Sequence, residues 1–116
     1  MTYKIETIPR FEKDVKKLKK KFPKIKRDLL SFIEELSSNP ELGTNLGENI
    51  FKVRIPNSSI PTGKSGGFRI ITYYKTDDVL YLVTIYSKTD QDTILTDKLK
   101  TIIQEEGLNN NFTKKD

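Results

Sequence analysis

The apolar residues of this chain change their spacing halfway along it. In the first half they recur at intervals of four, three and four positions, which puts them on one side of an α-helix: Phe11, Val15, Leu18 and Phe22. In the second half they alternate with polar residues, as on one face of a β-strand: Phe51, Val53 and Ile55. This change of period is typical of an α+β domain, in which helices pack on a mostly antiparallel sheet.

The first half is expected to form a short strand and two helices. Residues 2–6 alternate as a strand does, and Thr7 with Pro9 marks a helix start, with Thr7 as the cap. Pro23 interrupts the apolar stripe and starts the next helix, so that the two helices form an antiparallel hairpin. The segment 37–49 is rich in turn residues and is expected to end this hairpin.

The second half is expected to form three strands and a last helix. The strands cover 50–55, 68–74 and 79–86, and the polar turn KTDD joins the last two as a hairpin. Thr96 is the candidate cap of the last helix, and Gly107 is expected to end it in the left-handed conformation.

These elements give the order β-α-α-β-β-β-α and a single α+β domain over residues 1–107. The N-terminal helical hairpin is expected to pack on a mostly antiparallel four-stranded sheet. Residues 108–116, with the sequence LNNNFTKKD, are expected to form a flexible C-terminal tail.

The tripeptide Gly63-Lys64-Ser65 raises the question of a nucleotide-binding P-loop. A P-loop needs an earlier glycine at the position that Ser58 occupies, and it must lead into a helix whose N-terminus cradles phosphates. The residues after the tripeptide are instead β-branched and aromatic, which favours a strand. The sequence therefore excludes a P-loop.

Histidine and cysteine are both absent from the 116 residues. Without cysteine the chain forms neither disulfides nor thiolate metal sites, and without histidine it lacks the commonest general base and metal ligand. The formal charge of +5 and the pI near 9.3 suggest a polyanionic partner, either a nucleic acid or an acidic protein. No apolar run approaches the roughly 20 residues of a membrane span, and the charged N-terminus is no signal peptide. We therefore expect a cytoplasmic protein without metal, cofactor or membrane attachment.

Residues 10–27 hold ten Lys or Arg against two acids, Glu12 and Asp14. One interpretation is the solvated face of amphipathic helices, which requires polar residues between the apolar positions. The other is a surface that docks on RNA or the ribosome, where each neutralised phosphate adds salt-dependent affinity. The two interpretations are compatible.

The strands are expected to bring a further set of cations into one cleft. Lys52 and Arg54 lie two residues apart on one face of a strand whose other face is apolar, a pattern that an ordinary solvated strand face would also explain. The other members come from the neighbouring strands and the loop between them: Lys64, Arg69, Tyr86 and Lys88. Gly66 and Gly67 would let the backbone approach RNA closely, although a plain turn explains two glycines equally well.

A cationic cleft with one tyrosine suits a phosphodiester. RNA carries its own nucleophile, the 2′-hydroxyl, so positioning and charge stabilisation can cleave it without a metal. Arg69 is the natural bidentate partner for the phosphate on which charge builds up. A lysine whose pKa is lowered by neighbouring cations is one candidate base, and Tyr86 is an alternative proton carrier or a platform for base stacking.

Several stretches, in this order, resemble the RelE/ParE toxin superfamily, and its HigB-like branch most closely: TIPRFEKDVKKLKKKFPK, NPELGTNLG, FKVRIPN, GKSGGFRIITYY and VTIYSK. The resemblance covers about residues 2–105. It implies the same β-α-α-β-β-β-α fold and a toxin of a type II toxin–antitoxin system. It further implies an mRNA interferase that cuts mRNA on the translating ribosome, and a cognate antitoxin that masks the active site.

The resemblance also assigns roles to individual positions. Lys52 and Arg54 match the basic pair of the second-strand region of the family. Arg69 matches the arginine that follows the glycine loop and contacts phosphate. Lys64 matches the loop lysine, and Lys88 matches the basic position that ends the last strand.

Two departures from the family pattern leave the acid–base assignment open. Thr89 stands where well-studied members have a further arginine, and no tyrosine lies near the final helix, so Tyr86 is the candidate substitute. Two other functions on this fold stay open, a ParE-like gyrase-inhibiting toxin and a non-catalytic RNA-binding homologue. The cationic cluster argues against the gyrase inhibitor, which has no need of a site for a scissile phosphate.

Overall fold

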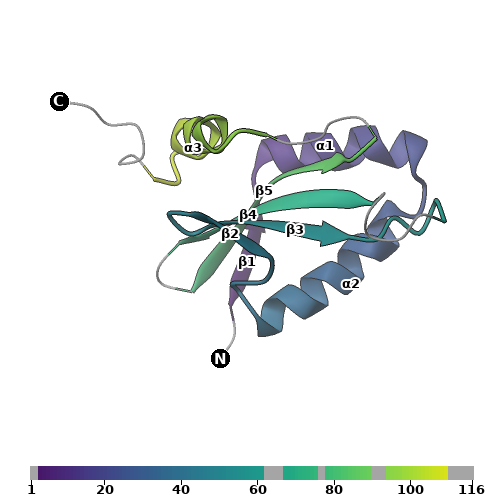
Figure 1. The fold of residues 1–116 in the computed structure, drawn as a ribbon, viewed down its shortest axis with the longest axis horizontal. Coiled ribbons are helices and arrows are strands. Elements are labelled where there is room, and N and C mark those ends of the chain that lie inside the picture. Colours follow the sequence, from purple (N-terminus) through teal and green to yellow (C-terminus); the bar gives the residue numbers. More distant parts are fainter. Residues whose placement is uncertain (1–2, 62–66, 76–77, 90–93, 110–116) are drawn as a thin grey trace.

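Within residues 3–61, 67–75, 78–89 and 94–109, which the computed structural model describes, five strands form one sheet and three helices pack against it (Figure 1). The strands are β1 (Lys4–Thr7), β2 (Thr44–Gly47), β3 (Ile50–Ile55), β4 (Phe68–Lys75) and β5 (Val79–Ser87). The helices are α1 (Pro9–Lys21), α2 (Ile25–Ser38) and α3 (Thr96–Glu105). The strand order across the sheet is β1-β5-β4-β3-β2.

The sheet is mostly antiparallel, as predicted, with β1 as the parallel exception beside β5. The prediction of four strands was wrong, because β2 lies inside the segment expected to be only a turn. β2 is short and irregular, with a register shift between Asn45 and Gly47, and only Leu46 among its residues is half-buried. Its backbone groups bond to β3, so tertiary pairing rather than local propensity makes it a strand.

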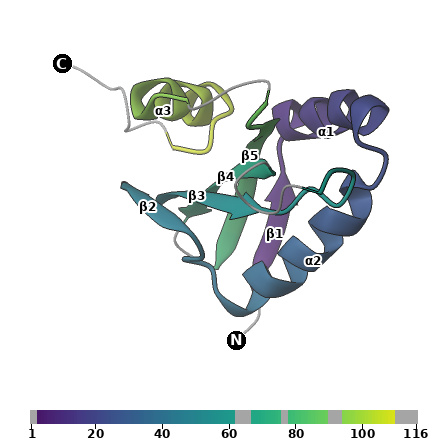
Figure 2. The ribbon, with the colours of Figure 1, turned by 45° about the vertical axis from the view of Figure 1, so that its right-hand side comes forward.

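The helices α1 and α2 cover one face of the sheet, and α3 lies on the other (Figure 2). On the first face Phe22 meets Phe68 edge to face, with ring centroids 5.5 Å apart. The remaining core side chains of α1 and α2 recur at helical spacing, as the sequence predicts: Phe11, Leu18, Ile25, Leu29, Phe32 and Leu36. None of the helices among the described residues has the length and apolar character needed to cross a membrane.

The starts of α1 and α3 differ from the prediction by one residue, and α2 begins at Ile25 rather than at Pro23. Neither predicted cap is formed. Ile8 and Leu95 occupy the N-cap positions of α1 and α3, with no side-chain cap at either. Thr7 instead donates a hydrogen bond to Glu12 Oε2 at 2.5 Å. Thr96 is the first residue of α3 rather than its cap.

The C-terminal helix α3 is anchored to the sheet at its middle and just beyond its last residue. Lys100 forms an ion pair with Glu48, in the turn between β2 and β3. Gly107 ends the helix with a φ of 76°, as predicted. Just beyond it, Asn109 Nδ2 donates a hydrogen bond to Tyr73 Oη at 2.8 Å. The rest of the predicted tail, residues 110–116, lies outside the described ranges.

Candidate functional site

Three predicted site residues lie in one row across the sheet. Arg54 of β3 is the Cα partner of Arg69 of β4, and Arg69 is the partner of Tyr86 of β5. Residues directly opposite each other on antiparallel strands point to the same face, with Cβ atoms about 4.5–5.5 Å apart. The structure thus brings Arg54, Arg69 and Tyr86 together on one face, and we call these three residues the cross-strand row.

The cross-strand row places two positive charges next to each other. Arg54 is exposed, whereas Arg69 is only 5% exposed. Like charges on directly opposed strand positions destabilise a sheet, and a partly buried guanidinium is costly in a low dielectric. A phosphate bound between the two arginines would relieve this repulsion, because both guanidinium groups donate charge-assisted hydrogen bonds. The arrangement is therefore suited to an anion.

Tyr86 is a buried member of the row, with 6% of its surface exposed. Its ring consequently offers little area on which a base could stack, so the stacking role would require the neighbouring chain to move. Its hydroxyl oxygen is buried too, although the side chain lines the pocket described below. Proton transfer from Tyr86 would require the same movement of the chain, so both roles of Tyr86 stay predictions.

Of the remaining predicted site residues, Lys52, Gly67 and Lys88 lie around the same end of the sheet. Lys52 shares the face of Arg54, is half-buried and lies opposite the apolar Ile71. Lys88 is exposed just beyond β5, and its backbone N–H donates to the Gly67 carbonyl at 3.1 Å. Lys64 and Gly66 lie outside the described residues.

Gly67 has a structural reason to be glycine. A Cβ atom at this position would lie 2.0 Å from the carbonyl oxygen of Ile55, at the end of β3. The close approach that the structure shows is therefore between two protein segments. Any approach of Gly67 to RNA stays a prediction.

The chain that follows β3 is held by the start of α2. Asp28 Oδ2 accepts a hydrogen bond from the Ser58 backbone N–H at 3.0 Å, and Ser59 Oγ accepts one from the Lys24 N–H at 3.1 Å. These bonds fix the segment that leaves the cross-strand row beyond Arg54. The loop is thus positioned by a helix on the opposite face of the sheet.

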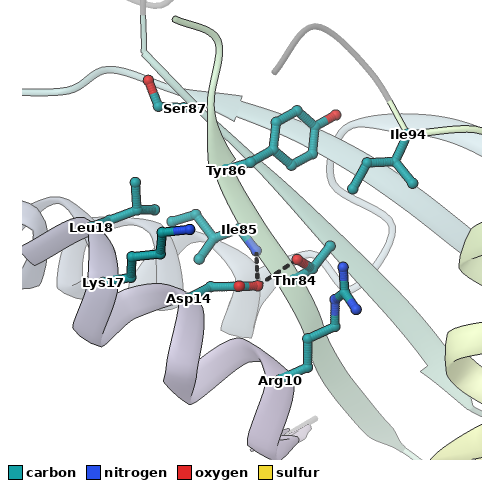
Figure 3. Close-up of a pocket in the computed structure, with 9 residues that line it drawn as sticks. All are labelled: Arg10, Asp14, Lys17, Leu18, Thr84, Ile85, Tyr86, Ser87 and Ile94. Carbon is teal, nitrogen blue, oxygen red and sulfur yellow. Dashed lines mark hydrogen bonds between the residues drawn. The ribbon is translucent and has the colours of Figure 1, made fainter. Parts of the chain in front are cut away.

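Sequence reasoning missed a pocket beside the row, at the edge of β5 (Figure 3). This edge pocket has a volume of about 130 Å³. Its lining comes from α1, from the end of β5 and from one residue that lies two positions before α3: Arg10, Asp14, Lys17, Leu18, Thr84, Ile85, Tyr86, Ser87 and Ile94. Nothing in the sequence separates Arg10 or Lys17 from the other cations of α1, because only the docking of α1 on β5 selects them.

Asp14 holds α1 against β5. Its Oδ2 accepts hydrogen bonds from Thr84 Oγ1 at 2.5 Å and from the Ile85 backbone N–H at 3.3 Å (Figure 3). The bond to Ile85 satisfies a strand N–H that has no partner strand on that side among the described residues. Asp14 therefore fixes the end of β5, which carries Tyr86.

The candidate site offers cations and one tyrosine, and the described residues hold no group of three or more acidic, histidine or cysteine side chains that could bind a metal ion. Clustered cations on a sheet face bind phosphate groups by charge-assisted hydrogen bonds. Fold and site together define a class of small α+β domain, in which a helix-backed sheet carries the cross-strand row.

The model of the family described as "RelE toxin of RelE / RelB toxin-antitoxin system" matches residues 4–115. The chain therefore belongs to the RelE toxin family, and the predicted RelE/ParE superfamily is confirmed. Among solved structures, the chain is similar to Escherichia coli toxin RelE, a double arginine-to-alanine mutant in the free state. The TM-score is 0.57 at 14% sequence identity, over 79% of this chain and 90% of that chain. At this identity the likeness supports the fold alone.

No curated protein matches the sequence significantly. The HigB-like branch that the motifs indicate stays a prediction. The roles of the individual site residues likewise stay predictions, and they enter the proposal below.

Proposed function

We propose that this toxin is a ribosome-dependent endoribonuclease, an mRNA interferase that cleaves mRNA by attack of its own 2′-hydroxyl. The observation that carries the proposal is the pair of arginines directly opposite each other, followed in the same row by a tyrosine. Membership of the RelE toxin family supports the same reading. Because the activity requires ribosomes, the protein would act in the cytoplasm.

The proposed reaction is an in-line displacement at phosphorus. The 2′-oxygen forms a bond to phosphorus while the bond from phosphorus to the 5′-oxygen breaks, which yields a 2′,3′-cyclic phosphate and a free 5′-hydroxyl. Negative charge grows on the non-bridging oxygens, and Arg54 and Arg69 would stabilise it from two adjacent strands. Lys52, on the same face, would hold the neighbouring RNA backbone.

Two protons must move in this reaction. One leaves the 2′-hydroxyl and one reaches the 5′-oxygen, so a base and an acid are needed. Tyr86 and Lys88 are the candidates, because they lie two residues apart at the end of β5 beside the row. No step requires a metal ion, since the arginines supply the charge stabilisation.

The partner of such a toxin is a cognate antitoxin protein. The exposed cations at this end of the sheet, such as Arg54 and Lys88, would attract an acidic segment that competes with RNA. Adding purified antitoxin in excess should then abolish cleavage. Unchanged cleavage would reject this part of the proposal.

The test is mRNA cleavage in a translating extract, read by primer extension. The wild type should cut, and Arg54→Gln should lose about 10²-fold or more in rate, because it removes one of two positioned cations. Arg69→Ala should lose at least as much, but Arg69 is buried, so the exposed Arg54 gives the cleaner variant. The matched control is Lys75→Gln, an exposed cation six residues beyond Arg69 along β4, about 20 Å away.

Three outcomes decide the proposal. Cleavage by the wild type and by the Lys75 variant, with loss in the Arg54 variant, supports the nuclease. Inhibition of gyrase supercoiling by the wild type without mRNA cleavage would reject it in favour of a ParE-like toxin. Equal activity of the wild type and the Arg54 variant would reject the role of the cross-strand row.

A further inference from the structure

The edge pocket continues the cross-strand row beyond the last strand. Tyr86 belongs to both, because it ends the row on β5 and lines the pocket. Neighbouring strands lie about 4.8 Å apart, so β3 and β5 are about 10 Å apart. The edge pocket lies immediately beyond β5. One nucleic-acid strand that crosses the arginines can therefore reach the pocket.

The two cations of the pocket, Arg10 and Lys17, share it with one carboxylate, that of Asp14. Figure 3 shows Arg10 and Lys17 reaching from α1 toward the end of β5, on either side of Asp14. No ion pair among the described residues involves Arg10 or Lys17. Arg10 Nε is buried and has no hydrogen-bond acceptor within the described part of the chain. A buried guanidinium N–H without an acceptor is costly, and its position in a pocket indicates an acceptor supplied by a ligand.

The carboxylate of Asp14 does not cancel this preference for an anion. Its Oδ2 already accepts hydrogen bonds from Thr84 and Ile85, which partly neutralise its charge. Two cations against one engaged carboxylate leave the pocket with a net positive charge. The rest of the lining is partly apolar, through Leu18 and Ile94, so the charges are less screened than on an open surface.

We infer that the edge pocket binds a phosphate group of the substrate RNA strand, next to the linkage held by the cross-strand row, with Arg10 and Lys17 as its ligands. This inference rests on the proposed function, since the phosphate in the pocket belongs to the same RNA strand that is cleaved. It gives α1 a role in substrate binding, which the amphipathic pattern of the helix does not predict. The volume of about 130 Å³ suits a phosphate or a single nucleotide unit rather than a larger ligand.

The chain offers a closely matched pair of variants to test this. Lys16 and Lys17 are neighbours on α1, both exposed and with the same charge, but only Lys17 lines the pocket. The probe is a short single-stranded RNA whose 2′-hydroxyls are all methylated, so that it cannot be cleaved. Its affinity for the purified toxin is measured by fluorescence anisotropy over a series of salt concentrations.

We expect Lys17→Ala to weaken binding and to flatten the salt dependence, log K against log salt, by about 0.7, the value for one phosphate of a single strand. Arg10→Gln should do the same, with thermal unfolding as the check that it folds. Lys16→Ala should leave the slope unchanged. Equal effects of the Lys16 and Lys17 variants, or no RNA binding by the wild type at low salt, would overturn the inference.

A second measurement separates the substrate strand from ribosomal RNA as the source of the phosphate. Binding of the variants to vacant ribosomes, measured by cosedimentation, should match that of the wild type. Weaker cosedimentation of Lys17→Ala with unchanged binding of the free strand would overturn the assignment to the substrate. The nuclease proposal can fail separately. If the wild type cut no mRNA but the Lys16 and Lys17 variants still differed in RNA binding, the phosphate site would stand and the proposed reaction would be rejected.

Discussion

Replacing Arg54 by glutamine should stabilise the fold while it removes cleavage. Arg54 and Arg69 are directly opposed on β3 and β4, so their like charges repel each other. Arg54→Gln removes one charge and keeps a polar side chain of similar length. The repulsion disappears, whereas the strand pairing and the apolar face of β3 are untouched.

The magnitude follows from the register. The Cβ atoms of a directly opposed pair are about 5 Å apart, and guanidinium groups that splay to about 6 Å repel by about 0.7 kcal/mol at the dielectric constant of water. Arg54 is exposed, so the screened value is the appropriate one. For a domain of this size, about 0.7 kcal/mol corresponds to a rise in melting temperature of about 2–4 °C.

The assay is thermal unfolding followed by circular dichroism, at low and at high salt. Lys52→Gln is the matched control, because it removes one positive charge from the same face of β3, opposite the apolar Ile71. We expect Arg54→Gln to melt higher than Lys52→Gln at low salt, and the difference to shrink at high salt as screening increases. A lower melting temperature for Arg54→Gln, or an equal rise in both variants, would refute the reasoning.

Three further predictions concern the groups that hold the site in place. Gly67→Ala should destabilise the fold by about 3 kcal/mol or more, seen as a lower urea midpoint, because its Cβ would lie 2.0 Å from Ile55 O. Asp14→Ala should cost about 2–4 kcal/mol in the same assay, because a hydroxyl and a backbone N–H of β5 lose their acceptor. The hydrogen bond to Glu48 raises the pKa of Lys100 above its usual 10.5. The ion pair that anchors α3 should therefore stabilise the fold below that pH and be lost as the pH rises through the raised pKa, which melting curves at increasing alkaline pH would show.

Each of these predictions has a control within the chain. Gly47→Ala meets nothing within 4 Å and carries only the strain of its φ of 98°, so it should cost about 1 kcal/mol. Glu12→Ala removes an exposed acceptor from Thr7 and should change stability by less than about 0.5 kcal/mol. A Gly67 variant no less stable than the Gly47 variant would contradict the close-approach argument. If Lys100→Gln lost stability at high pH as the wild type does, another group would be responsible.

The fold could be predicted from hydrophobic periodicity because most elements bury one regular face. The exception is β2, which presents Asn45 and Gly47, residues typical of turns, and half-buries only Leu46. A strand of this kind carries no periodic signal, since its pairing depends on β3 already being in place. Gly43, just before it, approaches β3 so closely that a Cβ would lie 2.5 Å from the Lys52 carbonyl oxygen.

Only those site residues whose position is set by strand alternation could be predicted from the sequence. Alternation places Arg54 on the polar face of β3. Antiparallel pairing of β3 with β4 then predicts that Arg54 and Arg69 lie close together. The burial of Tyr86 and the cations of the edge pocket depend on what packs beside β5. Lys17 and Lys16 are indistinguishable as sequence, and only the three-dimensional position of α1 turns one of them toward the pocket.

The edge pocket exists because β1 is short. β1 pairs with Val79–Leu82 and ends at Thr7, so on this edge the later half of β5 has no further strand within the described chain, while β4 pairs with it on the other side. Pro9 explains this ending, because it lacks the N–H that a continued ladder would need and its fixed φ suits the first turn of a helix. The chain therefore turns into α1 and lays it along the open edge of β5, where Asp14 replaces the missing strand as an acceptor. Had β1 continued, its backbone would occupy the place of Arg10 and Lys17, and the row ending at Tyr86 would meet a neutral strand instead of a cationic pocket.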